Sequence, residues 1–151
     1  MSTINSDIES LKAIIGDIIE NVLRTDGLET VKMKMAEAIN EHVYGAYQSP
    51  APEATRYERR KDEGGLIDPE NIDIVSYDRN DTEHIMTVKN LRTGYKGRNV
   101  GDVVERGTGY TWENSEIALN QPYPRPFYDE TDELLEKSDI DDLLFLALNT
   151  F

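Results

Sequence analysis

Apolar residues recur at helical spacing through most of the first 47 positions. The first stripe follows intervals of three and four residues and consists of Ile8, Leu11, Ile15, Ile18 and Val22, with Ile14, Ile19 and Leu23 at its edges. The second stripe consists of Val31, Met35, Ala38, Ile39, His42, Val43 and Ala46. This periodicity predicts a region of amphipathic helices over residues 1–47.

Local signals suggest where these helices begin and break. Ser6-Asp-Ile-Glu9 has the pattern of a capping box, in which the Ser6 hydroxyl accepts from the Glu9 amide and the Glu9 side chain returns the bond. Thr25-Asp-Gly27 separates the stripes, so the segments form either a hairpin or one bent helix, and the glycine favours the hairpin. The regular first stripe also suits packing against another chain.

Helical periodicity is absent from residues 48–71. Ser49-Pro-Ala-Pro52 favours extended backbone and ends the helix. Gly64-Gly65 and Asp68-Pro69 mark turns. A stretch of this length without regular structure is uncommon in a small domain and is usually functional or ordered by a partner. We therefore expect an extended arm or loop here.

Short segments rich in β-branched residues follow the arm. Ile72–Tyr77 and His84–Lys89, separated by Asp78–Asp81, predict a β-hairpin. Val100–Glu105 has the composition of a third strand. A small antiparallel sheet of three to four strands is therefore expected over residues 72–127.

The pattern turns helical again after Phe127. Ser138-Asp-Ile-Asp141 resembles a helix cap and precedes the apolar run Leu143–Leu148, so short C-terminal helices are expected over residues 128–151. The order of elements predicts an α+β fold. With 151 residues the chain has the length of one ordinary domain, so a single domain spanning 1–151 is expected.

The net charge of −14 is unevenly distributed. Residues 1–55 hold four basic and nine acidic side chains, residues 56–106 hold ten and eleven, and residues 107–151 hold two and ten. The two ends are therefore acidic and the middle is nearly neutral. Overall acidity disfavours binding to nucleic-acid phosphates and favours solubility.

One basic cluster stands out in the expected arm. It consists of Arg56, Arg59, Arg60 and Lys61. Three acidic residues interrupt it, which favours an inter-subunit salt-bridge patch over a nucleic-acid site. We expect Arg59 or Arg60 to meet Glu130 or Glu133 of a neighbouring subunit.

Residues that usually carry catalysis or bind metals are sparse. There is no cysteine, which excludes disulfides and thiolate metal sites. His42 lies on an apolar stripe, where a packed and hydrogen-bonded imidazole is expected, and His84 has Glu83 beside it but no third group at ligand spacing. The sequence contains no Gly-x-Ser-x-Gly elbow, phosphate-binding loop or calcium loop. We expect no enzyme activity, no cofactor and no metal.

The sequence carries no signal for a membrane or for secretion. Its longest apolar runs are only a few residues, so no membrane-spanning segment is expected. The first twelve residues contain acids and lack the basic-then-apolar order of a secretory signal. A soluble protein used inside a cell is expected.

One stretch combines glycines, aromatic residues and prolines. Gly107 and Gly109 permit a tight turn where side chains would clash. Tyr110 and Trp112 offer large rigid surfaces with a polar edge, as residues that anchor interfaces do. The alternating prolines of Pro122-Tyr-Pro-Arg-Pro-Phe127 stiffen an extended segment ahead of a helix. None of these side chains is a reactive group, so the stretch indicates a stiff shape suited to assembly.

The same stretch carries a family resemblance. A strand ending in Val-Glu-x-Gly-Thr-Gly, then Arg-Pro-Phe leading into a helix, is formed by Val104, Glu105, Gly107, Thr108, Gly109, Arg125, Pro126 and Phe127. With the helix–loop–sheet–helix order, this pattern resembles the neck and minor tail-component (head–tail joining, tail-completion) family of long-tailed bacteriophages. The resemblance implies a helical region, then a small antiparallel sheet backed by a helix, and assembly into rings at the head–tail junction or tail end.

On this resemblance we expect a non-catalytic structural subunit of a neck or tail-completion ring joining capsid and portal to the tail. Its implied partners are further copies of itself, in a hexamer or dodecamer, and neighbouring phage head-completion and tail proteins. No membrane is implied, and nucleic acid would be met at most by proximity in the channel. The implied location is the head–tail junction of the virion, after assembly in the host cytoplasm. Residues expected to form interfaces or fix the shape are Arg59, Arg60, Gly107, Gly109, Tyr110, Trp112, Arg125, Pro126 and Phe127.

Two other classes of function stay open. A small acidic protein could inhibit a host nucleic-acid enzyme by mimicking phosphate charge, although a mimic would be expected to space its acids along one element. A hydrolase could use a pair of carboxylates on a glycan. Thirty acidic residues provide such pairs by chance.

Overall fold

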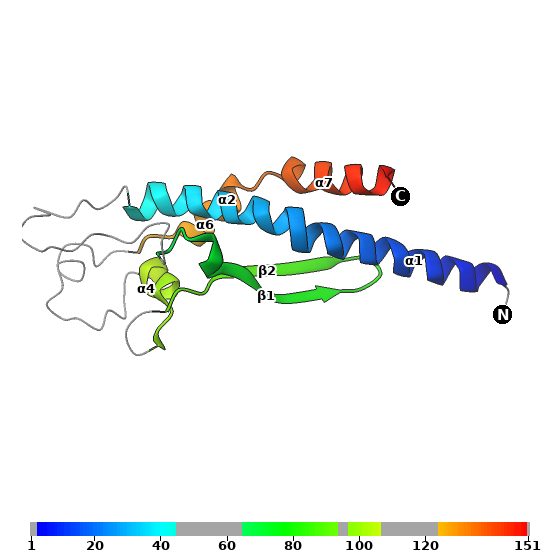
Figure 1. Ribbon diagram of the computed structural model, residues 1–151, viewed down its shortest axis with the longest axis horizontal. Helices are drawn as coiled ribbons and strands as arrows, with labels where there is room; N and C mark the ends of the chain where they lie inside the picture. Colours follow the sequence, from blue (N-terminus) through cyan, green and yellow to red (C-terminus); the bar gives the residue numbers. More distant parts are fainter. Residues whose placement is uncertain (1–2, 45–64, 94–96, 107–123, 151) are drawn as a thin grey trace, which may run out of the picture. The chain divides into compact units, whose positions relative to one another are not determined.

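A computed structural model describes residues 3–44, 65–93, 97–106 and 124–150 (Figure 1). The chain divides into two compact units. Unit 1 comprises Met1–Val31, Ile74–Val88 and Glu136–Phe151, and unit 2 comprises Lys32–Asp73 and Lys89–Leu135. The α+β class expected from the sequence is confirmed, with N-terminal helices, a small antiparallel sheet and short C-terminal helices.

The N-terminal region is helical without a break from Thr3 to Tyr44. Its parts are α1 (Thr3–Val22), a π-helical turn η1 (Leu23–Gly27), α2 (Leu28–Ile39) and a second π-helical turn η2 (Asn40–Tyr44). The residues flanking η1, Val22 and Leu28, both have α-helical backbone angles. Of the two arrangements expected around Thr25–Gly27, the helical hairpin is therefore wrong, and the two stripes lie on one continuous helical region.

Local bonds explain why the helix continues through this point. The Thr25 hydroxyl donates to the carbonyl of Asn21 at 2.7 Å and so turns back into the helix instead of capping a new one. Gly27 is buried within the helix. A glycine inside a helix costs only about 1 kcal/mol relative to alanine, which packing can offset.

Both expected capping signals lie inside helices. Because α1 begins at Thr3, Ser6 is already in the helix, and its carbonyl accepts from the Ser10 hydroxyl at 3.0 Å. Near the C-terminus, α7 (Lys137–Asn149) begins before Ser138. Its capping box is formed instead by Glu136 and Asp139, each side chain accepting from the other's backbone amide.

The sheet has two strands within the described part of the chain. The predicted hairpin is confirmed as β1 (Ile72–Arg79) and β2 (His84–Asn90). The expected third strand is wrong, because Val100–Arg106 forms the helix α4. The Asn99 side chain accepts from the amide of Asp102 at 2.9 Å, and this N-terminal cap outweighs the strand preference of the valines. Beside the hairpin, a single antiparallel bridge joins Thr93 and Asn99.

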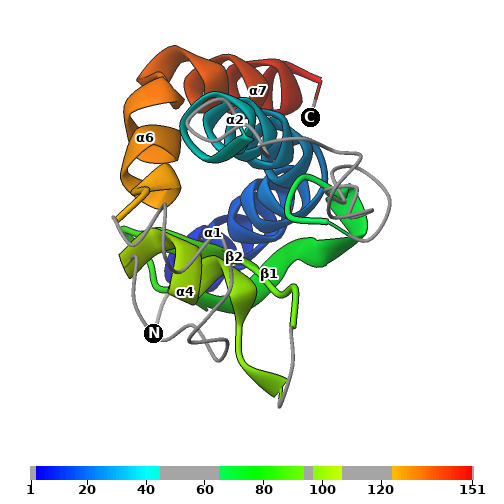
Figure 2. The same cartoon turned by 90° about the vertical axis from the view of Figure 1, so that its left-hand side faces the viewer.

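Unit 1 is built around α1. Helix α7 lies along α1 and also contacts η1 (Figures 1 and 2). The hairpin tip is tied to α1 by Arg79, whose guanidinium donates to Asp17 at 2.8 Å. The Arg24 guanidinium lies 4.6 Å from the ring centroid of Tyr77, a cation–π contact between the same two elements.

Of the described residues, most of the buried apolar ones belong to unit 2. They are Met35, Ala38, Ile39, Val43, Leu66, Ile72, Val104 and Phe127. Part of the expected arm belongs here: after a turn at residues 65–68, the short 3-10 helix η3 (Pro69–Asn71) is capped by Asp68, which accepts from the Glu70 amide. Residues 48–64 lie outside the described part. Among the described helices, none combines the length and apolar character needed to cross a bilayer.

Candidate functional site

Three of the residues expected at interfaces lie in the described part of the chain: Arg125, Pro126 and Phe127. Phe127 is fully buried and begins α6 (Phe127–Leu134), with Pro126 at the position before the helix. The Arg125 side chain is also buried, and its backbone amide donates to the carbonyl of Val104 in α4 at 3.1 Å. The other six, Arg59, Arg60, Gly107, Gly109, Tyr110 and Trp112, lie outside the described residues.

Asn90, at the end of β2, is fully buried and lies at the centre of a polar network in unit 2. Its side chain donates to the carbonyl of Leu66 at 2.6 Å and accepts from the amide of Arg92 at 3.1 Å. Its own amide donates to the phenol oxygen of Tyr128 in α6 at 3.0 Å, and its carbonyl accepts from the Asn99 side chain at 2.7 Å. One fully buried asparagine therefore holds four separate segments together.

Tight packing of α4 completes this network. A Cβ on Gly101 would lie 3.0 Å from the Tyr128 oxygen, 3.1 Å from Oδ1 of Asn99 and 3.3 Å from Cβ of Asn90. Only glycine allows the helix to approach the three polar residues so closely. This network, which we call the asparagine junction, is thus a rigid structural element whose hydrogen-bonding groups are already occupied.

A carboxylate at the edge of the junction joins α4 to α6. Glu105 accepts from the amide of Tyr128 at 3.0 Å. Burial raises the pKa of Glu105, Asp129 and Asp102 add to the rise, and the backbone amides of Tyr128 and Phe127 counteract it. Glu105 therefore satisfies the first turn of α6 but has no second carboxylate or nucleophile among its described hydrogen-bond partners.

Burial also affects the phenol of Tyr128. It raises the pKa of Tyr128 to about 12, with further contributions from the charges of Asp102 and Glu105, while the hydrogen bond from the Asn90 amide lowers it. A phenol with this pKa keeps its proton at neutral pH. It acts as a neutral hydrogen-bonding group and not as a base.

Both histidines lie close to a polar side chain, and His42 is partly exposed. The His42 Nε2 atom lies 3.3 Å from Oε2 of Glu130 in α6. Nδ1 of His84 is 2.7 Å from the hydroxyl of Tyr77, and the two rings pack edge to face. Glu130, expected to meet an arm arginine of a neighbouring subunit, thus has a histidine partner within its own unit.

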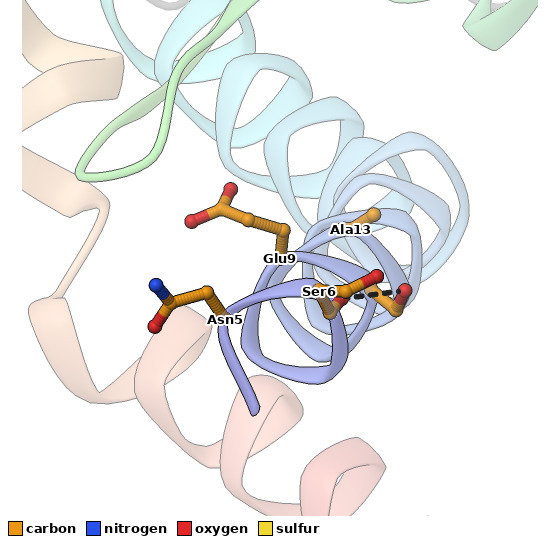
Figure 3. Close-up of a pocket in the computed structure, with 5 residues that line it drawn as sticks. Asn5, Ser6, Glu9 and Ala13 are labelled. Carbon is orange, nitrogen blue, oxygen red and sulfur yellow. Dashed lines mark hydrogen bonds between the residues drawn. The ribbon is translucent and has the colours of Figure 1, made fainter. Parts of the chain in front are cut away.

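No reactive constellation is found in the described residues. They contain no group of three or more histidine, cysteine, aspartate or glutamate side chains placed to hold a metal. A hollow on the surface of α1 is lined by Asn5, Ser6, Glu9, Ser10 and Ala13 (Figure 3). All five are exposed residues on the surface of a single helix, α1. This hollow provides no enclosed binding site.

The most distinctive surface of unit 1 is apolar. Large apolar side chains are exposed on α1, at Ile4, Ile8, Leu11 and Ile14, and on α7, at Phe145, Leu146 and Leu148. Scattered exposed apolar residues are ordinary, but rows of them on two helices mark interaction surfaces. We call these two rows the α1 face and the α7 face.

Sequence reasoning did not identify the asparagine junction. Asn99 carried a detectable signal, because Asn-Val-Gly-Asp102 fits a helix cap with an acidic residue three positions later. Asn90 carried none, since its partners Leu66 and Tyr128 lie 24 and 38 residues away along the chain. Its role depends on the tertiary fold.

Comparison with known proteins places the chain in one family. The YomN family matches residues 7–146, which covers both helical regions, the hairpin and the asparagine junction. No curated protein and no solved structure matches the chain. YomN is associated with bacteriophages, so the phage connection expected from the resemblance is supported. The family match does not assign a neck or tail-completion role. The chain belongs to the phage-associated YomN family.

Proposed function

We propose that this chain is a non-catalytic structural subunit of the phage neck or tail-completion ring that joins capsid and portal to the tail. The observation that carries the proposal is the exposure of the α1 and α7 faces, because rows of large apolar side chains are best accounted for by burial against other subunits. Membership of a phage-associated family supplies the setting.

The junction in unit 2 supports a mechanical role. Asn90 is fully buried and its polar groups are hydrogen-bonded to other segments of unit 2, which favours one fixed conformation over a reactive site. The hydrogen bond from the Arg125 amide to the Val104 carbonyl also holds together the two described segments that flank residues 107–123. That segment contains Tyr110 and Trp112, the aromatic residues expected to contact a neighbour.

Deletion of the gene from the phage tests the proposal. We expect the mutant lysate to contain filled heads and tails that are not joined, and a plasmid copy of the wild-type gene to restore complete particles. Negative-stain microscopy counts joined particles, and mass spectrometry of purified virions detects the chain. Joined, infectious particles from which the chain is absent would overturn the proposal and return attention to an inhibitor of a host enzyme.

A further inference from the structure

Three residues of the α1 face, Ile4, Ile8 and Leu11, begin a longer apolar row on α1 that has the spacing of a coiled-coil seam. Counting from the exposed N-terminal end, its apolar positions follow intervals of four, three, four, three and four: Ile4, Ile8, Leu11, Ile15, Ile18 and Val22. This places β-branched residues at the a positions (8, 15 and 22) and residues 4, 11 and 18 at the d positions of a heptad. A single surface helix has no need for so regular a repeat.

Within the part of the chain that the structure describes, only the C-terminal half of this seam is covered. Val22 is buried and Ile18 is partly buried, in the region where α1 meets α7 and η1. Every residue from Thr3 to Ile14 is exposed. Ile8 and Leu11 remain 46% and 47% exposed, and Ile4 is 68% exposed. Among the described residues, the N-terminal half of the seam therefore has no covering element and forms an exposed helix face.

The charges beside the exposed seam are self-complementary. Asp7 occupies a g position and Lys12 the following e position, and in a parallel pair of helices each g side chain meets the e side chain five residues later on its partner. Asp7 would face Lys12 of the second copy, twice per pair. Lys12 now contacts Glu9 at 3.3 Å, but both side chains are largely exposed, and such a pair contributes little that would oppose the exchange.

An antiparallel arrangement lacks this complementarity. If Ile8 packed in one layer with the partner's Leu11, Asp7 would face Ile14 and Lys12 would face Asn5.

The low net charge of this segment also permits close approach of two copies. Residues 3–16 contain two acids, Asp7 and Glu9, and one base, Lys12, a net of −1 in a chain whose total is −14.

From these observations we infer that the exposed half of α1 binds the same segment of a second copy of this chain, in a parallel and in-register coiled coil. The inference deepens the proposed function, because it names one surface through which copies associate, but it rests on α1 alone.

The absence of cysteine from the chain provides a clean test. A disulfide needs Cα atoms about 4.4–6.8 Å apart, a condition that identical d positions of parallel, in-register helices meet. Leu11→Cys should give disulfide-linked dimers under mild oxidation. Ser6→Cys, at the f position on the opposite side of the helix, is the matched control and should stay monomeric on a non-reducing gel.

A charge exchange provides the second measurement. Asp7→Lys and Lys12→Asp should each weaken self-association in sedimentation equilibrium several-fold, and the double variant should restore it, with helix content by circular dichroism unchanged throughout. Equal crosslinking of both cysteine variants, or a preference for Ile8→Cys mixed with Leu11→Cys over Leu11→Cys alone, would overturn the inference. So would a double variant weaker than the single ones. The presence of the chain in virions is measured separately, so either proposal can fail while the other stands.

Discussion

The phenol oxygen of Tyr128 accepts a 3.0 Å hydrogen bond from the backbone amide of Asn90, 38 residues earlier in the chain. Asn90 ends the hairpin and is fully buried, so its amide has no access to water as an alternative partner. This single bond joins the end of β2 to the first turn of α6. The stability of unit 2 should therefore depend on one hydroxyl group.

Replacing Tyr128 with Phe tests that dependence. The variant leaves the buried Asn90 amide without its acceptor, which should cost about 1–3 kcal/mol of unfolding free energy. Tyr77→Phe is the matched control, because its hydroxyl bonds the partly exposed His84 ring and its loss should cost about 1 kcal/mol or less. Urea titrations followed by circular dichroism measure both. Equal losses would show that the Tyr128 bond has no special weight.

The same phenol predicts a loss of stability in alkali. In the unfolded chain Tyr128 ionises with a pKa near its ordinary 10.0, whereas in the folded chain burial raises the pKa to about 12. Between these values the folded state binds more protons, so the unfolding free energy falls as pH rises from 10 to 12. Tyr128→Phe should show a shallower decline over this range in urea midpoints measured at several pH values. An unchanged slope would contradict the assignment.

Glu105 predicts a pH dependence on the acid side. Burial raises the pKa of Glu105 above its ordinary 4.5. In the window just above pH 4.5 the folded state therefore binds more protons than the unfolded state, and this group's contribution to stability declines as pH rises through that window. Glu105→Gln keeps an oxygen acceptor for the Tyr128 amide and removes the charge. It should be at least as stable as the parent at pH 7 and lack this component. A variant clearly less stable at pH 7 would mean that the charged form is the stabilising one.

Periodicity predicted the elements whose side chains alternate between core and solvent. The stripes predicted within residues 1–47 form one helical region from Thr3 to Tyr44, and the β-hairpin formed at the predicted segments, because each places apolar residues on one face. Val100–Arg106 became a helix since a cap at Asn99 and the close approach of Gly101 to Tyr128 outweigh the strand preference of two valines. The asparagine junction depends on partners far along the chain, which local patterns do not report.

The close approach of Gly101 predicts opposite effects for two glycine substitutions. Gly101→Ala forces a methyl group against the Tyr128 oxygen and the Asn99 side chain, so it should cost about 1–3 kcal/mol. At Gly16 in α1, a Cβ would meet only the Arg79 guanidinium, at an ordinary 3.5 Å. Gly16→Ala should therefore gain about 0.5–1 kcal/mol from helix propensity. Thermal unfolding of both variants beside the parent checks the prediction, and stabilisation by both would show that α4 is less tightly packed than described.

Phage complementation separates a structural role from a catalytic one. Phe127 is fully buried, and its replacement by Ala should cost about 3–5 kcal/mol and impair folding or particle assembly. Glu105→Gln and Glu113→Gln remove carboxylates that an acid–base mechanism could use, but they preserve side-chain size and should leave virions infectious. Titres from a gene-deleted phage carrying each variant on a plasmid measure the outcome, with circular dichroism reporting whether each variant folds. If folded Glu→Gln variants lose infectivity while Phe127→Ala keeps it, a hydrolase using these carboxylates becomes the better account of the chain.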